Sequence, residues 1–143
     1  MAAQLHTEGR EFLFKVAFTA EESVPSNYYV GLCTDLSIAE NASLSALTEL
    51  TDTDYTRALI PRSIVGFSVA GTGTNDIKVT SDDAAFVVYT SGVTWTKAES
   101  WFMANTSDDS GKLIASGPLN SGSGWTVAEG EELSFDIEIT WPG

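Results

Sequence analysis

The sequence predicts a mostly β protein, built as a two-sheet sandwich or a barrel of short antiparallel strands. Many short stretches are rich in β-branched and aromatic residues, and segments rich in Gly, Ser, Asn and Asp separate them at roughly regular spacing. The composition, 43% hydrophobic and 19% charged, is that of a globular chain. The 143 residues contain no linker-like segment, so we expect one domain over residues 1–143.

The first element is ambiguous between a strand and a short helix in residues 7–23, "TEGREFLFKVAFTAEES". Alternating apolar residues favour a strand: Phe12, Phe14, Val16 and Phe18. A stripe at helical spacing favours a helix: Phe12, Leu13, Val16, Ala17 and Ala20. Thr7 as a helix N-cap, with Glu8 and Glu11 in the first turn, decides for the helix, and Pro25 closes the segment.

The next element, "NYYVGLCT" at residues 27–34, reads as a strand. One face would carry Tyr28, Val30 and Leu32, and the other Tyr29, Gly31 and Cys33. Both faces are largely apolar, which indicates a central strand covered on both sides. Residues 40–57 follow, with Leu44, Leu47 and Leu50 at helical spacing, and predict a second short helix or a packed loop.

From about residue 56 onward, the sequence pattern predicts strands and turns. We expect strands near residues 56–60, 64–69, 76–80, 84–89, 100–105 and 112–116, with a Gly-rich turn at residues 71–75. The last strand, "ELSFDIEITW" at residues 132–141, alternates most clearly. Its inward-pointing residues would be Leu133, Phe135, Ile137, Ile139 and Trp141.

The aromatic residues raise the question of a sugar-binding face. Two similar stretches, "WTKAE" from Trp95 and "WTVAE" from Trp125, each follow a Gly-containing turn, and we interpret them as two similar turns with a tryptophan covering a sheet edge. Partial exposure is expected for these two tryptophans, whereas Trp141 is expected in the core. A core or edge-covering role is favoured over a ligand platform.

No catalytic constellation is apparent, and we expect no enzymatic activity. Cys33 is the only cysteine and His6 the only histidine, and His6 is expected in a mobile N-terminal tail. Cys33 is therefore interpreted as a small buried hydrophobe rather than a nucleophile, and a four-ligand zinc site is excluded. Calcium is disfavoured because the acidic loops do not match a spaced-ligand loop; their candidate ligands are Asp52, Asp54, Asn105, Asp108 and Asp109.

The charge argues against a nucleic-acid partner. The formal net charge is −13, and the seven basic residues are scattered, so the chain would repel a phosphate backbone. The longest apolar stretch, "AAFVVY" at residues 84–89, is too short to span a bilayer, and the N-terminus lacks the apolar core of a secretory signal. Synthesis in the cytosol, with no membrane and no cofactor, is the expectation.

Several stretches together resemble a family of small virion proteins of tailed bacteriophages. They run in the order "EGREFLFKVAF", "PSNYYVGLCTD", "LTELTDTDYTRALI", "WTKAESWFMANTSDDSGKLIASGPL" and "GEELSFDIEITW", and cover nearly the whole chain. The resemblance implies a β-sandwich of jelly-roll type that assembles on the phage particle. It carries no catalytic residues. In its "Y-x-R" element it implies structural roles: Tyr55 packed at a strand start and Arg57 paired with an acidic neighbour.

The resemblance leads us to expect a virion structural protein, made in the bacterial host cytoplasm. A capsid decoration (cement) protein, bound to the major capsid protein lattice as a homo-oligomer or multivalent array, is the first hypothesis. A tail or neck component is the alternative within the same class. From another class, a carbohydrate-binding module would suit the tryptophans and polar loops.

Overall fold

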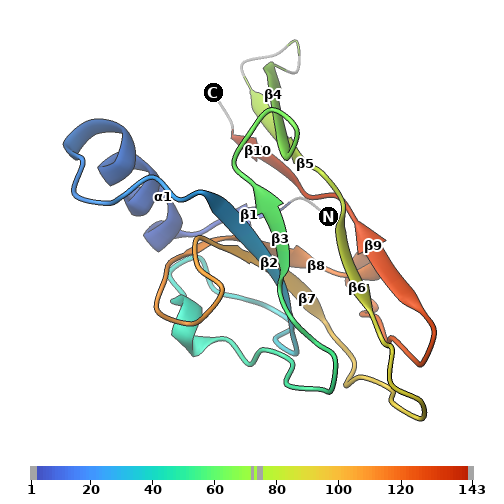
Figure 1. Cartoon of the computed structure of the whole chain (residues 1–143). Helices are drawn as coiled ribbons and strands as arrows, with labels where there is room; N and C mark the ends of the chain where they lie inside the picture. The colour runs from blue at the N-terminus through green and yellow to red at the C-terminus, as the bar shows by residue number, and fades with distance from the viewer. Residues whose placement is uncertain (1–2, 72, 74–75, 142–143) are drawn as a thin grey trace.

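The computed structural model describes residues 3–71, 73 and 76–141. In these residues, ten strands form three antiparallel sheets with the orders β1-β8-β7-β2-β3, β10-β5-β4 and β6-β9 (Figure 1). The prediction of a mostly β chain of antiparallel sheets with a short N-terminal helix is confirmed. The expected turn at residues 71–75 lies largely outside the described residues.

The elements have the following bounds. The strands are β1 (Gln4–Leu5), β2 (Asn27–Cys33), β3 (Ala58–Pro61), β4 (Phe67–Gly71), β5 (Ile77–Ser81), β6 (Ala84–Val87), β7 (Ser100–Ala104), β8 (Leu113–Pro118), β9 (Glu132–Phe135) and β10 (Glu138–Trp141). The helix α1 (Thr7–Phe14) continues into a π-helical turn at Lys15–Thr19. Two three-residue 3-10 turns lie at Leu44–Ala46 and Asn120–Gly122, so the leucine-rich segment holds one helical turn within a packed loop.

Helix α1 is present, but its cap differs from the expectation. The N-cap is His6, with extended backbone, and not Thr7. Glu8 lies in the first turn, where its charge favours the helix dipole. Its Oε1 also links the helix to its neighbours, because it accepts the backbone N–H groups of Leu44 at 2.9 Å and of Leu113, the first residue of β8, at 2.5 Å. The helix ends at Ala20, which has a positive φ of 55°, before Pro25 is reached.

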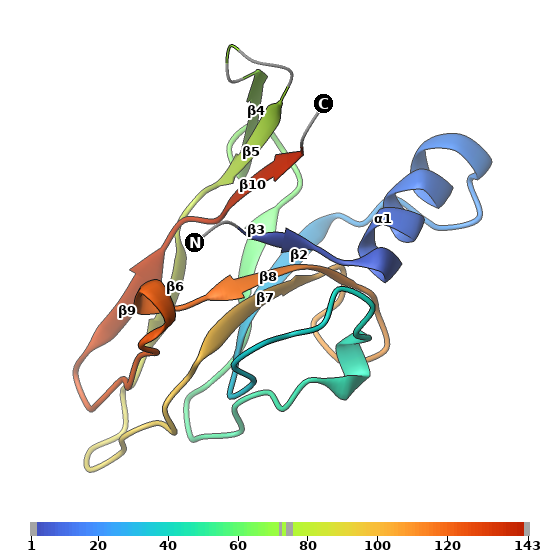
Figure 2. The ribbon, with the colours of Figure 1, turned by 180° about the vertical axis from the view of Figure 1, so that it is seen from behind.

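Strand β2 is central, as predicted. It pairs with β3 on one side and β7 on the other, and Figure 2 shows it inside the five-stranded sheet. One face of the sheet packs into the main core against the two smaller sheets, with residues that include Val30, Leu32, Phe86 and Ile137. The opposite face carries a second cluster of Cys33, Leu44, Phe102, Ala104 and Leu113. The sheet is therefore covered on both faces, in a sandwich-like arrangement.

The last predicted strand, residues 132–141, is divided into two. Strand β9 pairs with β6, whereas β10 pairs with β5, so the chain changes sheet at Asp136 and Ile137. Two hydrogen bonds hold this corner: Ser81 N–H donates to the Ile137 carbonyl at 2.9 Å, and Ile137 N–H donates to Ser81 Oγ at 2.8 Å. Alternation of side chains continues through the break, which explains why the sequence pattern conceals it.

Strand β4 begins later than predicted, at Phe67. The preceding residues form a turn in which Ser63 Oγ accepts the backbone N–H groups of Val65 at 3.2 Å and Gly66 at 3.3 Å. A serine hydroxyl that bonds to nearby backbone competes with strand pairing, and this local preference prevails over the β propensity of Ile64 and Val65. Both apolar side chains of the turn are exposed as a result.

Candidate interaction surface

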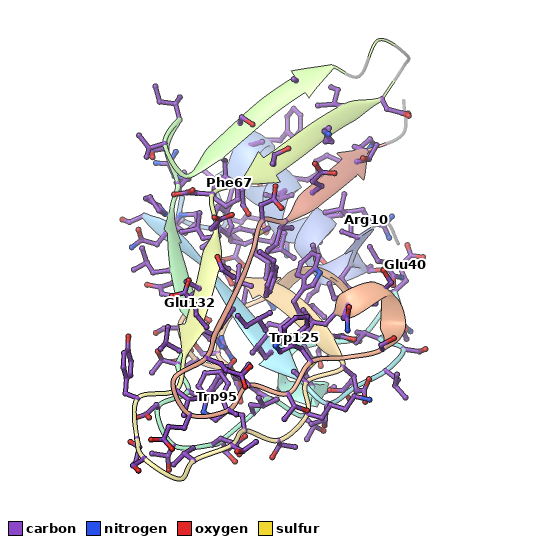
Figure 3. The ribbon with its side chains drawn as sticks, turned by 90° about the vertical axis from the view of Figure 1, so that its right-hand side faces the viewer. Arg10, Glu40, Phe67, Trp95, Trp125 and Glu132 are labelled. Carbon is purple, nitrogen blue, oxygen red and sulfur yellow. The ribbon has the colours of Figure 1, made fainter. Side chains whose placement is uncertain are left out.

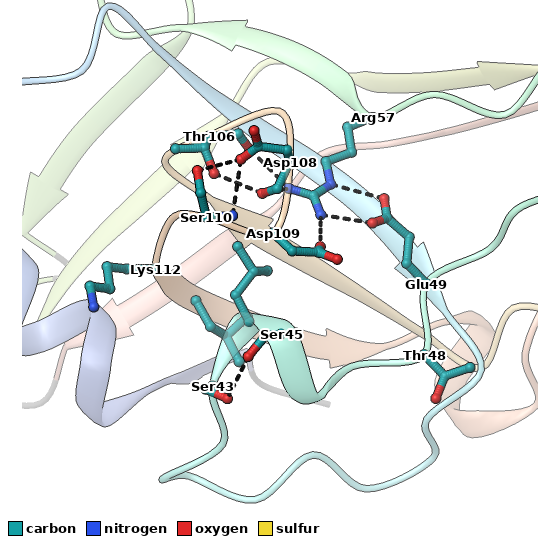
Figure 4. Close-up of polar contacts among 12 residues, drawn as sticks. Ser43, Ser45, Thr48, Glu49, Arg57, Thr106, Asp108, Asp109, Ser110 and Lys112 are labelled. Carbon is teal, nitrogen blue, oxygen red and sulfur yellow. Dashed lines mark hydrogen bonds and ion pairs between the residues drawn. The ribbon is translucent and has the colours of Figure 1, made fainter.

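A buried arginine ties the β2–β3 and β7–β8 loops to the five-stranded sheet. Arg57 donates to both carboxylate oxygens of Glu49, at 2.9 and 2.7 Å, and to Asp109 Oδ1 at 2.8 Å (Figure 4). It also donates to the backbone carbonyls of Thr106 and Asp108, and its guanidinium lies 5.0 Å from the ring centroid of Phe102. The pairing with an acidic neighbour, implied by the resemblance, is present.

Tyr55 completes this cluster. Its hydroxyl donates to Glu49 Oε1 at 2.7 Å and accepts the Leu32 backbone N–H at 2.8 Å, while its ring packs on Phe86 and Trp95. Burial would lower the pKa of Arg57, but the hydrogen bonds and charge of Glu49 outweigh it and raise that pKa. The Arg57 guanidinium and the Tyr55 hydroxyl bond to protein groups, so the cluster holds the loops in place.

Cys33 and His6 lie in separate places. Cys33 is fully buried, and burial raises the pKa of its thiol to about 12, so it is a core residue, as predicted. His6 is also fully buried, and the expectation of a mobile tail is wrong. Its ring hydrogen bonds to Ser116 Oγ at 2.7 Å and to the Glu40 carbonyl at 3.1 Å, and burial lowers its pKa.

The acidic loop residues bond to neighbouring backbone. Asp54 accepts the N–H groups of Tyr89 and Thr90, and these bonds hold the pKa of its carboxyl below the usual value. Asp52 accepts from Thr96, Asp108 from Ser110, and Asn105 Oδ1 accepts the Lys112 N–H at 2.6 Å. Within the described ranges, no group of three or more His, Cys, Asp or Glu side chains is placed to hold a metal ion.

The four tryptophans differ in exposure. Trp95 and Trp101 are buried, so the expected partial exposure of Trp95 is wrong. The Trp95 indole N–H donates to the Thr53 carbonyl at 2.7 Å. The two similar stretches pair with each other: backbone N–H groups of Ala98 and Trp125 each donate to the other's carbonyl. Trp125 is 39% exposed and lines a groove of about 500 Å³ with Asn120, Glu132 and Asp136. Figure 3 labels Trp125 and Glu132 among the side chains.

Trp141 is 40% exposed, so its assignment to the core is wrong. It borders a groove of about 470 Å³ where the β4-β5-β10 sheet diverges from the five-stranded sheet. Inner-face residues of both sheets line this groove: Leu5, Tyr28, Phe67, Val69, Ile77, Val79, Met103, Ile114, Ile139 and Trp141. The one charged side chain among the groove's described lining residues is Arg62, so the sandwich is open and almost wholly apolar at this end.

A second apolar groove adjoins the first at Trp141. Its aromatic wall comes from the helical segment, where Phe14 contacts both Phe18 and Trp141, with ring centroids 6.0 and 6.4 Å apart. We call the combined surface the apolar face. Its exposed members are Phe14, Phe18, Ile64, Val69, Ile77 and Trp141. An exposed apolar surface of this extent is typical of a site that contacts another molecule.

The charge on the apolar face differs from that of the whole chain. The charged residues that line its two grooves are three cations, Arg10, Lys15 and Arg62, and two anions, Glu11 and Glu21. Arg10 is also paired with Glu40, and Lys15 with Glu11. The acidic excess behind the net charge of −13 therefore lies elsewhere on the molecule.

No protein-family model matches this sequence, and no curated protein matches it significantly. The structure describes no helix that is long and apolar enough to cross a membrane. Sequence reasoning missed the apolar face, because its members come from α1, β4, β5, β10 and the turn before β4. The one available signal was Ile64, whose place in an apolar stretch predicts a strand rather than an exposed turn.

Proposed function

We propose that this protein is a structural component of a tailed-bacteriophage virion, and within it a decoration protein that binds the outer capsid lattice. The observation that carries the proposal is the apolar face, an extended surface left uncovered on a chain with a net charge of −13. Such a surface suits a protein whose final environment is an assembly. The resemblance described above supplies the class of assembly.

The stretches that carry the resemblance occupy the centre of the fold. "YVGL" is in β2, "GKLIASGPL" forms β8 and the turn before it, and the "LTEL…Y-x-R" segment supplies Glu49, Tyr55 and Arg57. These residues make structural contacts, which supports a shared framework rather than a shared reaction. The neighbours β1-β8 and β2-β7, distant in sequence, are compatible with a jelly-roll, which we retain as part of the proposal.

Repeated weak contacts explain how a small protein would hold a shell. Each attached copy raises the effective concentration for the next contact of the same array, so modest individual affinities suffice. Stabilisation follows by linkage, because a protein that binds only the assembled lattice shifts the equilibrium toward it.

The test compares purified particles with and without the protein, by mass spectrometry and by resistance to heat and to low salt. The proposal expects many copies per mature particle and lower resistance in particles that lack the protein. Absence from mature virions would overturn the proposal. A few copies located at the tail would replace decoration with the tail or neck alternative.

A second candidate function, carbohydrate binding, is favoured by one observation. The groove beside Trp125 combines an exposed indole with amide and carboxylate groups of Asn120, Glu132 and Asp136, a combination that stacks on and hydrogen bonds to sugars. A glycan array with the free protein tests it, with Trp125→Ala as the binding-deficient variant. Glycan binding that survives this substitution would contradict a site in this groove.

A further inference from the structure

We propose that the apolar face is where a second copy of this chain docks, with the two β4 strands pairing antiparallel across a two-fold axis. The inference rests on the role of this face as a protein-docking surface, proposed above, and adds its occupant. Three features of the described residues carry it: the edge of β4, the side chains beside that edge and the distribution of charge.

Strand β4 is an edge strand without the usual protection. It lies outermost in the order β10-β5-β4, and its sequence, "FSVAG", contains no charged residue and no proline. Exposed edges that carry neither are ready to pair with another strand. Figure 1 shows the β4–β5 hairpin projecting from the body of the molecule, so a partner strand has access to it.

The other edges are protected. Strand β1 has two residues, and β3 ends at Pro61. Strand β10 begins with Glu138, β9 begins with Glu132, and β6 follows Asp82 and Asp83. Short length, proline and charge are the features that keep edges from pairing, so within the described chain β4 stands apart.

The outward-facing backbone groups of β4 can be assigned from its ladder with β5. Phe67 N–H bonds to the Ser63 carbonyl and Ser81 N–H to the Ile137 carbonyl, so the facing residues Phe67 and Ser81 are a non-hydrogen-bonded pair. Bonded and non-bonded pairs alternate in an antiparallel ladder, so the N–H and C=O groups of Val69 point away from β5. A second β4 strand would pair with these groups.

Apolar side chains flank this edge. Val69 is 67% exposed, and Ile64, in the turn that leads into β4, is 97% exposed. In a two-fold contact each copy presents the same patch, so Ile64 and Val69 of one copy would cover apolar surface on the other. Contact between two apolar patches requires no charged partner, which agrees with the nearly balanced charge of the lining residues.

The charge is compatible with self-association through this face. Two copies of net charge −13 repel each other, and least where the acidic residues are fewest. Docking through the apolar face would also keep the acidic surfaces apart. Because the remaining repulsion is screened by salt, the dimer should strengthen as NaCl is added. Association with a basic partner surface would weaken instead.

Sedimentation velocity of the purified full chain over a range of concentrations tests the proposal. We expect a dimer at high concentration, and a Val69→Lys variant whose dissociation constant is at least about tenfold weaker, because like charges would face each other across the new strand pair. Tyr89→Lys is the matched control. It makes the same charge change at a residue that is 79% exposed, in the segment after β6 at the far end from the hairpin (Figure 1).

Several outcomes would overturn the proposal: a wild type that stays monomeric at every concentration and salt level, a Val69→Lys variant that dimerises like the wild type, or equal loss in both lysine variants. Circular dichroism checks that each variant is folded. If Val69→Lys is not, Ile64→Lys takes its place. Particle binding by a monomeric wild type would overturn this inference and leave the proposed function standing. A protein that dimerises but is absent from virions would support this inference and overturn the proposed function.

Discussion

Arg57 shows how a single charged side chain can be retained inside a small β protein. Its side chain is nearly buried, and Glu49 matches the guanidinium with two parallel hydrogen bonds. Asp109 contacts the same guanidinium from an exposed position. Because a buried charge is tolerated only when it is paired, the two acidic partners should contribute very differently to stability.

Neutralising the two partners separately tests this difference. We expect Glu49→Gln to lower the free energy of unfolding by about 2–4 kcal/mol, since it leaves the buried guanidinium with only the exposed Asp109 carboxylate as a countercharge. Asp109→Asn, the matched control at the exposed partner, should cost less than about 1 kcal/mol. Urea unfolding measures both. Equal losses would contradict the assignment of Glu49 as the principal partner.

The buried thiol of Cys33 predicts a loss of stability in alkali. Its pKa is raised to about 12 in the folded state, so between pH 9 and pH 12 the unfolded chain loses a proton that the folded chain keeps. The contribution of the Cys33 thiol to the free energy of unfolding is therefore fully present below the pKa of the unfolded chain and decreases as the pH rises above it. We expect a decrease of about 1 kcal/mol from this group between pH 8 and pH 10.

Cys33→Ala isolates that contribution, because it should flatten the pH dependence of unfolding while leaving other titrations in place. In the native wild type at neutral pH, a thiol reagent should label Cys33 only as fast as the protein unfolds. Rapid labelling of the folded protein would contradict the buried position.

At the level of elements, sequence reasoning located most strands but not their partners. The patterns of residues 27–34 and 100–105 correspond to β2 and β7 because each strand's own side chains record its burial. The change of sheet at Asp136 is not visible in the sequence, because the alternation of apolar and polar residues continues through it. His6 escaped for the same reason: its burial depends on Ser116 and Glu40, which are far away in the sequence.

Gly9 offers a test of how closely α1 approaches the sheet. A Cβ added there would lie 2.5 Å from Ile114 Cα and 2.7 Å from the Ile114 carbonyl oxygen, both backbone atoms that cannot turn aside. Alanine would favour the helix by about 1 kcal/mol, but the clash should cost more. We expect Gly9→Ala to destabilise the protein by about 1–2 kcal/mol net.

The matched control is Gly71→Ala, where an added Cβ meets no atom within 4 Å and φ is not positive. Thermal unfolding of both variants, followed by circular dichroism, should show a lower Tm for Gly9→Ala alone. A stabilised Gly9→Ala variant would mean that the helix moves away from β8 at little cost.

The whole molecule combines an acidic surface with one apolar face of nearly balanced charge. The acidity was evident from composition, but the apolar face was not, because it depends on how far the two sheets diverge. Trp141 illustrates the difference: its sequence pattern placed it inward, and it does point to the inner side of β10, yet the opposing sheet is not close enough to bury it.

The net charge predicts that NaCl stabilises the free protein. At neutral pH, charges on a chain of −13 repel one another more strongly in the compact state than in the unfolded one, and salt screens that repulsion. We expect Tm to rise with NaCl, measured on the Val69→Lys variant so that self-association does not contribute. Near pH 4, close to the isoelectric point of about 4.1, the rise should be much smaller. A fall in Tm at neutral pH would show that ion pairs dominate.

The corner at Ser81 and Ile137 has a mechanical consequence. The same two chain segments pass from the β6-β9 sheet in the body to the β5-β10 ladder that supports the projecting hairpin, and Ser81 clamps them together with its N–H and its hydroxyl. The projecting hairpin is thus joined to the body of the molecule through this corner. A sideways force on β4 and β5 would therefore act on these two hydrogen bonds and, through them, on the main core.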